Sequence, residues 1–404
     1  MLAVRLQSLR NIWRSIVLLC GVSFGFLLLL ELFFRIFWPQ PLAWDTGMVW
    51  EPVAGLGWQR RPNLNIRVNT GEREVRVVSD ALRHRIGTVP EEKPDVRILS
   101  VGDSFVEALQ VDYGQTMTTL LAKALAMSSG RKVGVVNAGV GGWDPNQYRI
   151  MAQQELERAK YALVLVFVYM ENDLVDRRLE SFAPTTRLTP PQPRYDTVRA
   201  MLSTLSVLGD AWLRQHSHLY TFCLNSVELR KIRAGAYTQH FLSNIMRSNS
   251  ESPAWRVTGE VLAETAGIAA EYDTPVMYVL LPPPHYIDEN MLKTYVRAFG
   301  IELSQVDIAQ PARLLMAELA KRGLTVVDAT EALRTAFKAG EKDLYGHVDR
   351  HFGPAGHQVM AQFLAPLVAK HLLSHPPGQF EDLTVMPGPL NSRAMPVHAG
   401  SIFP

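Results

Sequence analysis

The chain has 404 residues, a length that suggests roughly two or three domains and permits a large buried core. A formal net charge of +2 with 20% charged residues shows no global bias toward nucleic acid or toward an acidic partner. Two cysteines, Cys20 and Cys223, do not form a disulfide framework, so cysteine usage leaves the compartment undecided.

A long apolar stretch near the N-terminus predicts a membrane span. Residues 12–34 are long enough to cross a hydrocarbon core of about 30 Å at about 1.5 Å per residue. Arg5, Arg10 and Arg14 precede the continuous apolar run that begins at Ile16, without any acidic residue among them, which favours a cytoplasmic N-terminus. The segment after the span lacks a good small-x-small cleavage site. We therefore expect an uncleaved single-pass anchor, with the remainder of the chain in the periplasm or another extracytoplasmic space.

The remainder begins with a lead-in, residues 39–93, which is polar and contains short strand-like pieces. Short apolar runs rich in β-branched residues follow, alternating with helical patterns, at 96–101, 133–136, 162–169, 275–281 and 324–329. One helical stretch is expected over about 106–127, and a final helix from 354 to about 373. Continuous apolar strands that alternate with helices predict an α/β domain over 94–375, with a parallel sheet of about five strands covered on both sides.

Two segments depart from this alternation. Residues 176–253 contain a Pro-rich turn and apolar stretches, and we interpret them as a helical insertion. The insertion is either a lid or substrate wall, or a packing subdomain with no role in chemistry. Residues 376–404 are rich in Pro and Gly and are predicted to be disordered. The expected organisation is therefore an anchor at 1–38, a lead-in at 39–93, an α/β domain at 94–375 that contains the insertion, and a tail at 376–404.

The first chemical motif is Gly102-Asp103-Ser104-Phe105, directly after the first predicted strand. Gly102 permits a tight turn, and Ser104 falls where the next helix begins. Unpaired backbone N–H groups at such a place favour negative charge on a bound oxygen, as a serine nucleophile requires. The alternative is that Ser104 only caps the helix, which serine does well.

Two further motifs follow the second and third strands. Asn-Ala-Gly-Val-Gly-Gly, residues 137–142, allows close approach of the backbone, and a glycine N–H can donate to an oxyanion. It lacks the third glycine that a dinucleotide fingerprint needs at its proper spacing. Asn172 follows the third strand and can point its amide toward the same edge of the sheet. Its alternative is an ordinary turn residue.

The fourth motif, His-Val-Asp-Arg-His at 347–351, precedes the last helix. His351 can take a proton from a serine, and Asp349 can hold the imidazole in the correct tautomer. The alternatives are a solvated loop and a zinc site built from His347, His351 and His357. No Cys-x-x-Cys or second ligand cluster supports zinc, so we expect no metal and no cofactor.

In this order, the four motifs resemble the sequence blocks of the SGNH (GDSL) hydrolase superfamily, over about residues 94 to 372. The resemblance implies a three-layer, flavodoxin-like α/β fold and a catalytic triad of Ser104, Asp349 and His351. It also implies an oxyanion hole formed by the Ser104 N–H, the Asn172 side chain and a glycine N–H. That glycine is best placed at Gly142, with Gly139 a poorer match.

The last block has one residue between Asp349 and His351, where the family usually has two. This variant resembles membrane-associated and periplasmic members linked to O-acetylation of surface polysaccharides. The resemblance implies an esterase or O-acyltransferase acting on exported glycans, with a membrane partner to deliver the acyl donor if the enzyme is a transferase. An esterase or lipase for small esters or lipids is one alternative. A non-catalytic glycan-binding or scaffold protein of an envelope assembly is the other.

Overall fold

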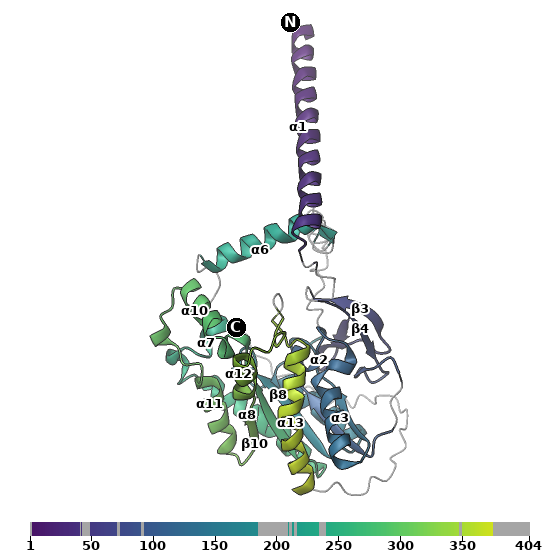
Figure 1. The fold of residues 1–404 in the computed structure, drawn as a ribbon, viewed down its shortest axis with the longest axis vertical. Coiled ribbons are helices and arrows are strands. Elements are labelled where there is room, and N and C mark those ends of the chain that lie inside the picture. The colour runs from purple at the N-terminus through teal and green to yellow at the C-terminus, as the bar shows by residue number, and fades with distance from the viewer. Residues whose placement is uncertain are drawn as a thin grey trace, which may run out of the picture.

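The computed structural model describes residues 2–40, 42, 49–70, 73–89, 93–184, 209, 212–213, 216–233, 240–346 and 350–374. The predicted disordered tail, most of the Pro-rich part of the insertion, and Asp349 with His347 lie outside these residues. The described chain has a long N-terminal helix that projects from an α/β body (Figure 1).

The body is built on an eight-stranded mixed sheet in the order β10-β9-β8-β6-β7-β5-β4-β3. Its parallel part has five strands: β6 (Val96–Val101), β7 (Val133–Asn137), β8 (Leu163–Tyr169), β9 (Val276–Leu281) and β10 (Thr325–Asp328). Counted along the chain, these five strands lie in the order 2-1-3-4-5, which is the flavodoxin-like arrangement. The predicted α/β class and the five predicted strands are confirmed.

The sheet is larger than expected because the lead-in contributes to it. Strands β3 (Asn65–Asn69), β4 (Glu74–Ser79) and β5 (Arg85–Ile86) are antiparallel to one another, and β5 pairs with β7. They extend the sheet at the β7 side through one residue pair, Arg85 with Asn137, at the end of β7. A separate hairpin is formed by β1 (Trp50–Val53) and β2 (Gly57–Arg60).

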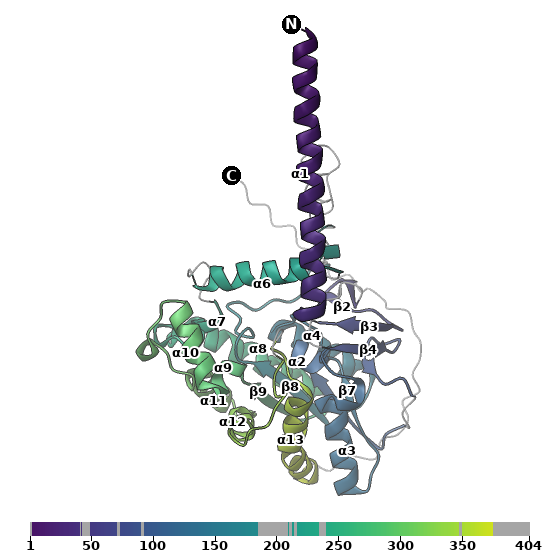
Figure 2. The ribbon, with the colours of Figure 1, turned by 45° about the horizontal axis from the view of Figure 1, so that its top comes forward.

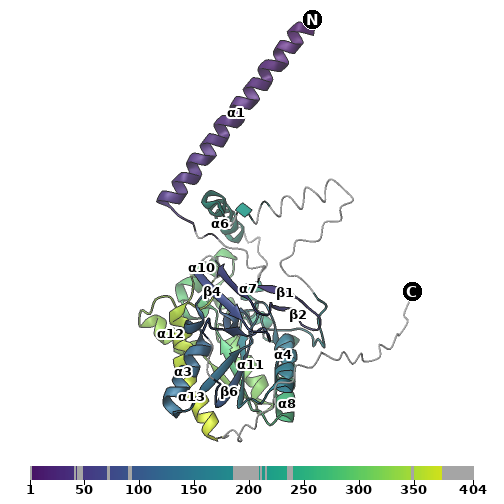
Figure 3. The same cartoon turned by 90° about the vertical axis from the view of Figure 1, so that its right-hand side faces the viewer.

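Helices cover both faces of the sheet. One face carries α4 (Pro145–Arg158), α8 (Pro253–Glu271) and α11 (Gln310–Ala320), and the other carries α3 (Met117–Ser129), α12 (Thr330–Lys338) and α13 (Pro354–Ser374), as Figure 3 shows. Strand β8 reflects this arrangement, because all seven of its residues are buried between the two layers of helices. Val164, Val166 and Val168 join the core on the first face, whereas the alternate residues join the core on the second.

The shorter helices lie at the ends of strands and between the longer helices. They are α2 (Ser104–Glu107), α7 (His240–Ser243), α9 (Pro284–Ile287) and α10 (Glu289–Ala298). The expected continuous helix over 106–127 is wrong, because α2 ends after one turn and α3 starts only at Met117. Ala108 adopts a left-handed conformation, with φ of 59°. The buried guanidinium of Arg85 binds the carbonyls of Glu107 and Ala108, so the end of α2 is satisfied by a side chain from another strand.

The N-terminal helix α1 (Leu2–Phe37) is long and apolar enough over Arg10–Phe37 to cross a membrane, judged by length and composition. Helix α6 (His218–Arg233), from the insertion, runs across its foot (Figure 2). Glu31 of α1 accepts hydrogen bonds from the His218 and Leu219 N–H groups at the start of α6, at 3.0 and 2.9 Å. The Phe222 ring lies 4.5 Å from that of Phe34. The insertion is thus connected to the N-terminal helix by a carboxylate that caps α6 and by an aromatic contact.

A buried histidine joins the lead-in to helix α4. His84 Nδ1 lies 3.1 Å from Asp80 Oδ2, and His84 Nε2 lies 3.2 Å from Glu155 Oε1. Burial alone would lower the pKa of His84, but its interactions with Asp80 and Glu155 outweigh burial and raise the pKa to about 9. The protonated imidazole therefore stabilises the folded chain.

We expect the stability of the protein to fall as the pH rises through about 9, because His84 then loses its proton between two carboxylates. The contribution is fully present below the ordinary histidine pKa of 6.5 and is on the order of 3 kcal/mol. Thermal unfolding of the full chain in detergent, measured from pH 6 to 10, tests this. His84→Gln should be less stable at neutral pH and should lack this alkaline loss. An equal alkaline loss in the variant would assign the effect to another group.

Candidate active site

Ser104, the candidate nucleophile, follows β6, the strand at which the strand order of the parallel sheet reverses. Strand β6 has β7 on one side and β8 on the other, and the loops after β6 and β8 start at the same edge. Ser104 is the first residue of α2, directly after β6. Asp103 caps α2 through Oδ1, which accepts the Phe105 N–H at 2.9 Å. Ser104 therefore does not act as the cap, which was the alternative interpretation of this serine.

A serine–histidine pair is present at this edge. Ser104 Oγ lies 2.7 Å from His351 Nε2, although the two residues are 247 positions apart in the sequence. The Phe105 ring packs against the imidazole, with ring centroids 4.9 Å apart. The hydrogen bond is short enough for direct proton transfer between Oγ and Nε2. Asp349, the third expected member of the triad, lies outside the described residues.

The glycine block lies beside Ser104. A Cβ atom added to Gly141 would lie 3.7 Å from the Ser104 Cβ. Gly139 is buried, and a Cβ there would lie 2.5 Å from the Val106 Cβ and 2.8 Å from the Glu107 N. The Gly139 N–H donates to Asn137 Oδ1 at 3.3 Å. Gly139 thus permits close packing of α2, whereas Gly142, with φ of +74°, lies further along the loop.

Asn172 lies in the turn directly after β8, with an exposed side chain. The next residue, Asp173, is buried and accepts hydrogen bonds from the Tyr169 N–H at 2.7 Å and the Tyr148 hydroxyl at 2.9 Å. These bonds fix the turn that carries Asn172. Since β8 is the neighbour of β6, the structure brings Asn172, Ser104 and His351 to the same edge of the sheet.

Two further titratable groups beside the pair were not identified from the sequence as site residues. Burial raises the pKa of Glu171 to about 7, against the opposing effect of the Tyr169 hydroxyl, which donates to its carboxylate at 2.5 Å. Arg350 has φ of +62°, and its guanidinium lies 4.7 Å from the centre of the Tyr295 ring. Arg350 is the single residue between Asp349 and His351, and its type and position in the sequence did not mark it as a site residue.

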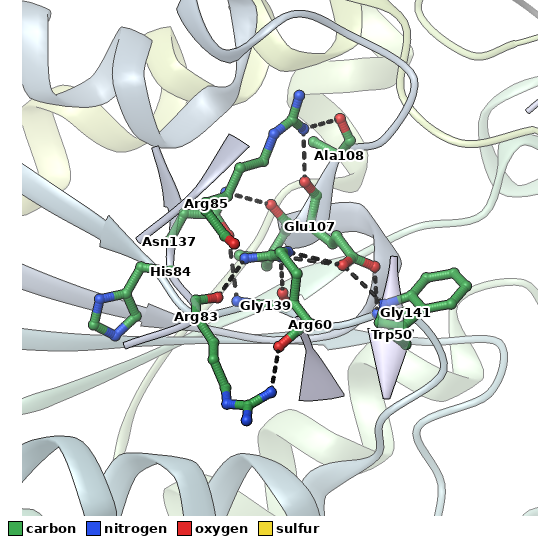
Figure 4. Close-up of polar contacts among 12 residues, drawn as sticks. Trp50, Arg60, Arg83, His84, Arg85, Glu107, Ala108, Asn137, Gly139 and Gly141 are labelled. Atoms are coloured by element: carbon green, nitrogen blue, oxygen red, sulfur yellow. Dashed lines mark hydrogen bonds and ion pairs between the residues drawn. The ribbon is translucent and has the colours of Figure 1, made fainter. Parts of the chain in front are cut away.

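Figure 4 shows a buried polar network behind the glycine block. Its centre is Glu107, whose side chain is 0% exposed and lies 3.1 Å from the Arg60 guanidinium, also 0% exposed. Glu107 Oε1 also accepts the Trp50 Nε1–H at 3.0 Å, and Oε2 accepts the Gly141 N–H at 2.6 Å. Arg60 Nη2 donates to the Gly139 carbonyl at 2.5 Å. This network joins the lead-in, helix α2 and the glycine block.

The sequence left open a metal site built from His347, His351 and His357, of which His347 lies outside the described residues. No cluster of three or more His, Cys, Asp or Glu side chains able to hold a metal ion occurs in the part of the chain that the structure describes. His357 is buried in the core next to α3, and its Nδ1 accepts the Met117 N–H at 3.3 Å. Its role is therefore in packing and in satisfying the first turn of α3.

No protein-family model matches the sequence, and no curated relative matches it. Solved structures do resemble it in fold. A lipolytic protein of the G-D-S-L family from Veillonella parvula is 13% identical, over 67% of this chain and 97% of its own, with a TM-score of 0.35. An acetylxylan esterase from Geobacillus stearothermophilus is 12% identical, over 68% and 95%, with a TM-score of 0.37.

A two-domain esterase active on acetylated mannans is also similar, at 12% identity and a TM-score of 0.37. The match covers 72% of this chain and 53% of that one. These similarities, at 12–13% identity, concern the fold alone.

Proposed function

We propose that the chain is a serine-dependent acyl-transfer enzyme of the SGNH type, acting as an ester hydrolase or an O-acyltransferase. The single observation that carries the proposal is the 2.7 Å contact between Ser104 Oγ and His351 Nε2, next to the glycine block. A nucleophile in contact with its base, beside backbone N–H groups, is the arrangement that acyl transfer requires.

In the proposed mechanism, His351 Nε2 takes the Ser104 proton as Oγ attacks the acyl carbon of the ester. The tetrahedral oxyanion is held by the Ser104 and Gly142 N–H groups and the Asn172 amide. Collapse of this intermediate breaks the ester bond, and the departing alkoxide takes the proton from His351. Water or a sugar hydroxyl then attacks the acyl carbon, again with His351 as base. Collapse of this second intermediate breaks the bond between the acyl carbon and Ser104 Oγ, and His351 returns the proton to Oγ. Asp349 is proposed to hold the imidazole through its other ring nitrogen.

At Ser104, stabilisation of the oxyanion comes from individual N–H groups, with no contribution from a long helix dipole. Helix α2 is a single turn of four residues, so a long helix dipole does not contribute at Ser104. Any stabilisation of the oxyanion therefore depends on how accurately each donor is held.

We place the catalytic domain on the outer side of a membrane, held by the apolar part of α1. Arg5, Arg10 and Arg14, which lie on the N-terminal side of the continuous apolar run from Ile16, support a cytoplasmic N-terminus. The resemblance of the last sequence block to members linked to polysaccharide O-acetylation supports an acylated or acylatable exported glycan as the substrate. If the chain is a transferase, a separate membrane protein is proposed to deliver the acyl donor.

The first test is active-site labelling of the full chain in detergent by a fluorophosphonate probe, which reacts with activated serines. We expect labelling of the wild type, none of Ser104→Ala, and a rate about 10²–10⁴-fold lower for His351→Gln, because the base is lost. Ser128→Ala, which changes an exposed serine at the end of α3, is the control and should label normally. Undiminished labelling of a folded Ser104→Ala would remove the proposed nucleophile.

The second test concerns the substrate. Exported glycans from cells with wild-type protein, with Ser104→Ala and without the protein should be compared by mass spectrometry. Loss of acetyl groups in the two deficient strains indicates a transferase, and a gain indicates an esterase. Unchanged glycans with turnover of small esters or lipids by the purified protein would contradict the proposed glycan substrate. Glycan binding that is equal in wild type and Ser104→Ala, without turnover, would favour a binding or scaffold protein.

A further inference from the structure

The hairpin β1–β2 contacts the glycine block through Trp58 as well as through Arg60. Trp58 Nε1 donates to the Gly141 carbonyl at 3.0 Å. The Gly141 N–H donates to Glu107 Oε2 at 2.6 Å. Both backbone polar groups of Gly141 are thus held by side chains, one from the lead-in and one from the helix that carries Ser104.

The bond to Trp58 also fixes the next residue. The Gly141 carbonyl and the Gly142 N–H belong to one peptide unit, which is planar and trans, so the two groups point in opposite directions. Fixing the carbonyl with an indole N–H therefore fixes the direction of the Gly142 N–H. That N–H is the backbone oxyanion donor in the proposed function.

Glu107 itself is held firmly. Its Oε1 accepts from Arg60 and Trp50, and its Oε2 accepts from Gly141. A buried carboxylate with a bound guanidinium and further N–H donors has little freedom to reorient. There is also little room beside it, because a Cβ on Gly141 would lie 2.9 Å from Glu107 Oε2 and 3.0 Å from Trp50 Cζ2.

We infer that Trp58 and Glu107 are positioning residues for the oxyanion hole, which makes the hairpin between the anchor and the α/β domain part of the catalytic machinery. The inference rests on the proposed function. Glu107 lies three residues after Ser104 on α2, so it sets the glycine loop relative to the nucleophile. Trp58 then sets the orientation of the following peptide.

The test uses Trp58→Phe in the full chain in detergent, with para-nitrophenyl acetate as substrate. Phenylalanine keeps an aromatic ring but removes the N–H that holds the Gly141 carbonyl. Loss of a whole oxyanion donor costs about 10²–10³ in rate, so a misdirected donor should lower kcat by about 10–10²-fold, with KM unchanged. Affinity for phenylboronic acid, which forms a tetrahedral adduct on an active serine, should fall by the same factor as kcat.

The matched control is Trp255→Phe. Trp255 Nε1 donates to the Asn249 carbonyl at 2.8 Å, so this variant loses the same kind of bond in α8. It should keep kcat and boronate affinity. A Trp58→Phe variant that behaves like Trp255→Phe in both readouts would overturn the inference.

Gly141→Ala provides a second variant in case Trp58→Phe does not fold. It retains every charge and moves the loop by adding a methyl group, and it should show the same loss in kcat and boronate affinity. Wild-type kcat and boronate affinity in a folded Gly141→Ala would contradict a requirement for this loop position. Ser104→Ala in the same assay separates the two proposals, since its retained turnover would contradict the serine mechanism itself.

Discussion

The parallel pairing of β6 with both β7 and β8 is the constraint on which the rest of the molecule depends. Parallel strands end at the same edge, so the loops after these three strands meet there without any long connection between them. Ser104, the glycine block and Asn172 each follow one of the three strands directly. His351 reaches the same edge from the loop that precedes α13. The sheet thus determines which residues can cooperate.

Buried charge adds a second constraint at this edge. The ion pair between Arg60 and Glu107 is fully removed from solvent, and such a pair is tolerated when further hydrogen bonds satisfy both partners. Here those bonds go to backbone groups of the glycine block, at Gly139 and Gly141. The free energy needed to bury the charges is therefore offset by bonds that also fix the loop. An apolar hairpin would pack as well but would leave these backbone groups without partners.

The parallel strands were predictable because their sequence pattern has a direct physical cause. A strand covered on both faces is apolar at nearly every position, as β8 is, and its short length and β-branched residues distinguish it from a buried helix. Ser104 and His351 were predictable because their motifs flank predicted strands and helices. The structure brings their side chains to within 2.7 Å of each other, while the catalytic roles of Ser104, His351, Asp349, Asn172 and Gly142 stay predictions.

Other features were not predictable because their causes are distant in the sequence. Arg60 and Trp58 have no distinguishing pattern in the lead-in sequence, and their roles depend on the contact of the hairpin with the glycine block. The end of α2 at Ala108 depends on Arg85, a residue from β5 that binds the carbonyls of the turn. The lead-in strands pair with β7 through a single residue pair, Arg85 with Asn137, which local periodicity does not specify.

The central claim is that Ser104 becomes acylated during turnover. The most direct measurement is intact-protein and peptide mass spectrometry of the full chain, quenched with acid during hydrolysis of para-nitrophenyl acetate. The account predicts an acetyl group on Ser104, formed and lost at rates compatible with turnover, and its absence in Ser104→Ala. Ester turnover with no acetyl group on Ser104, or with equal turnover by a folded Ser104→Ala, would contradict the account.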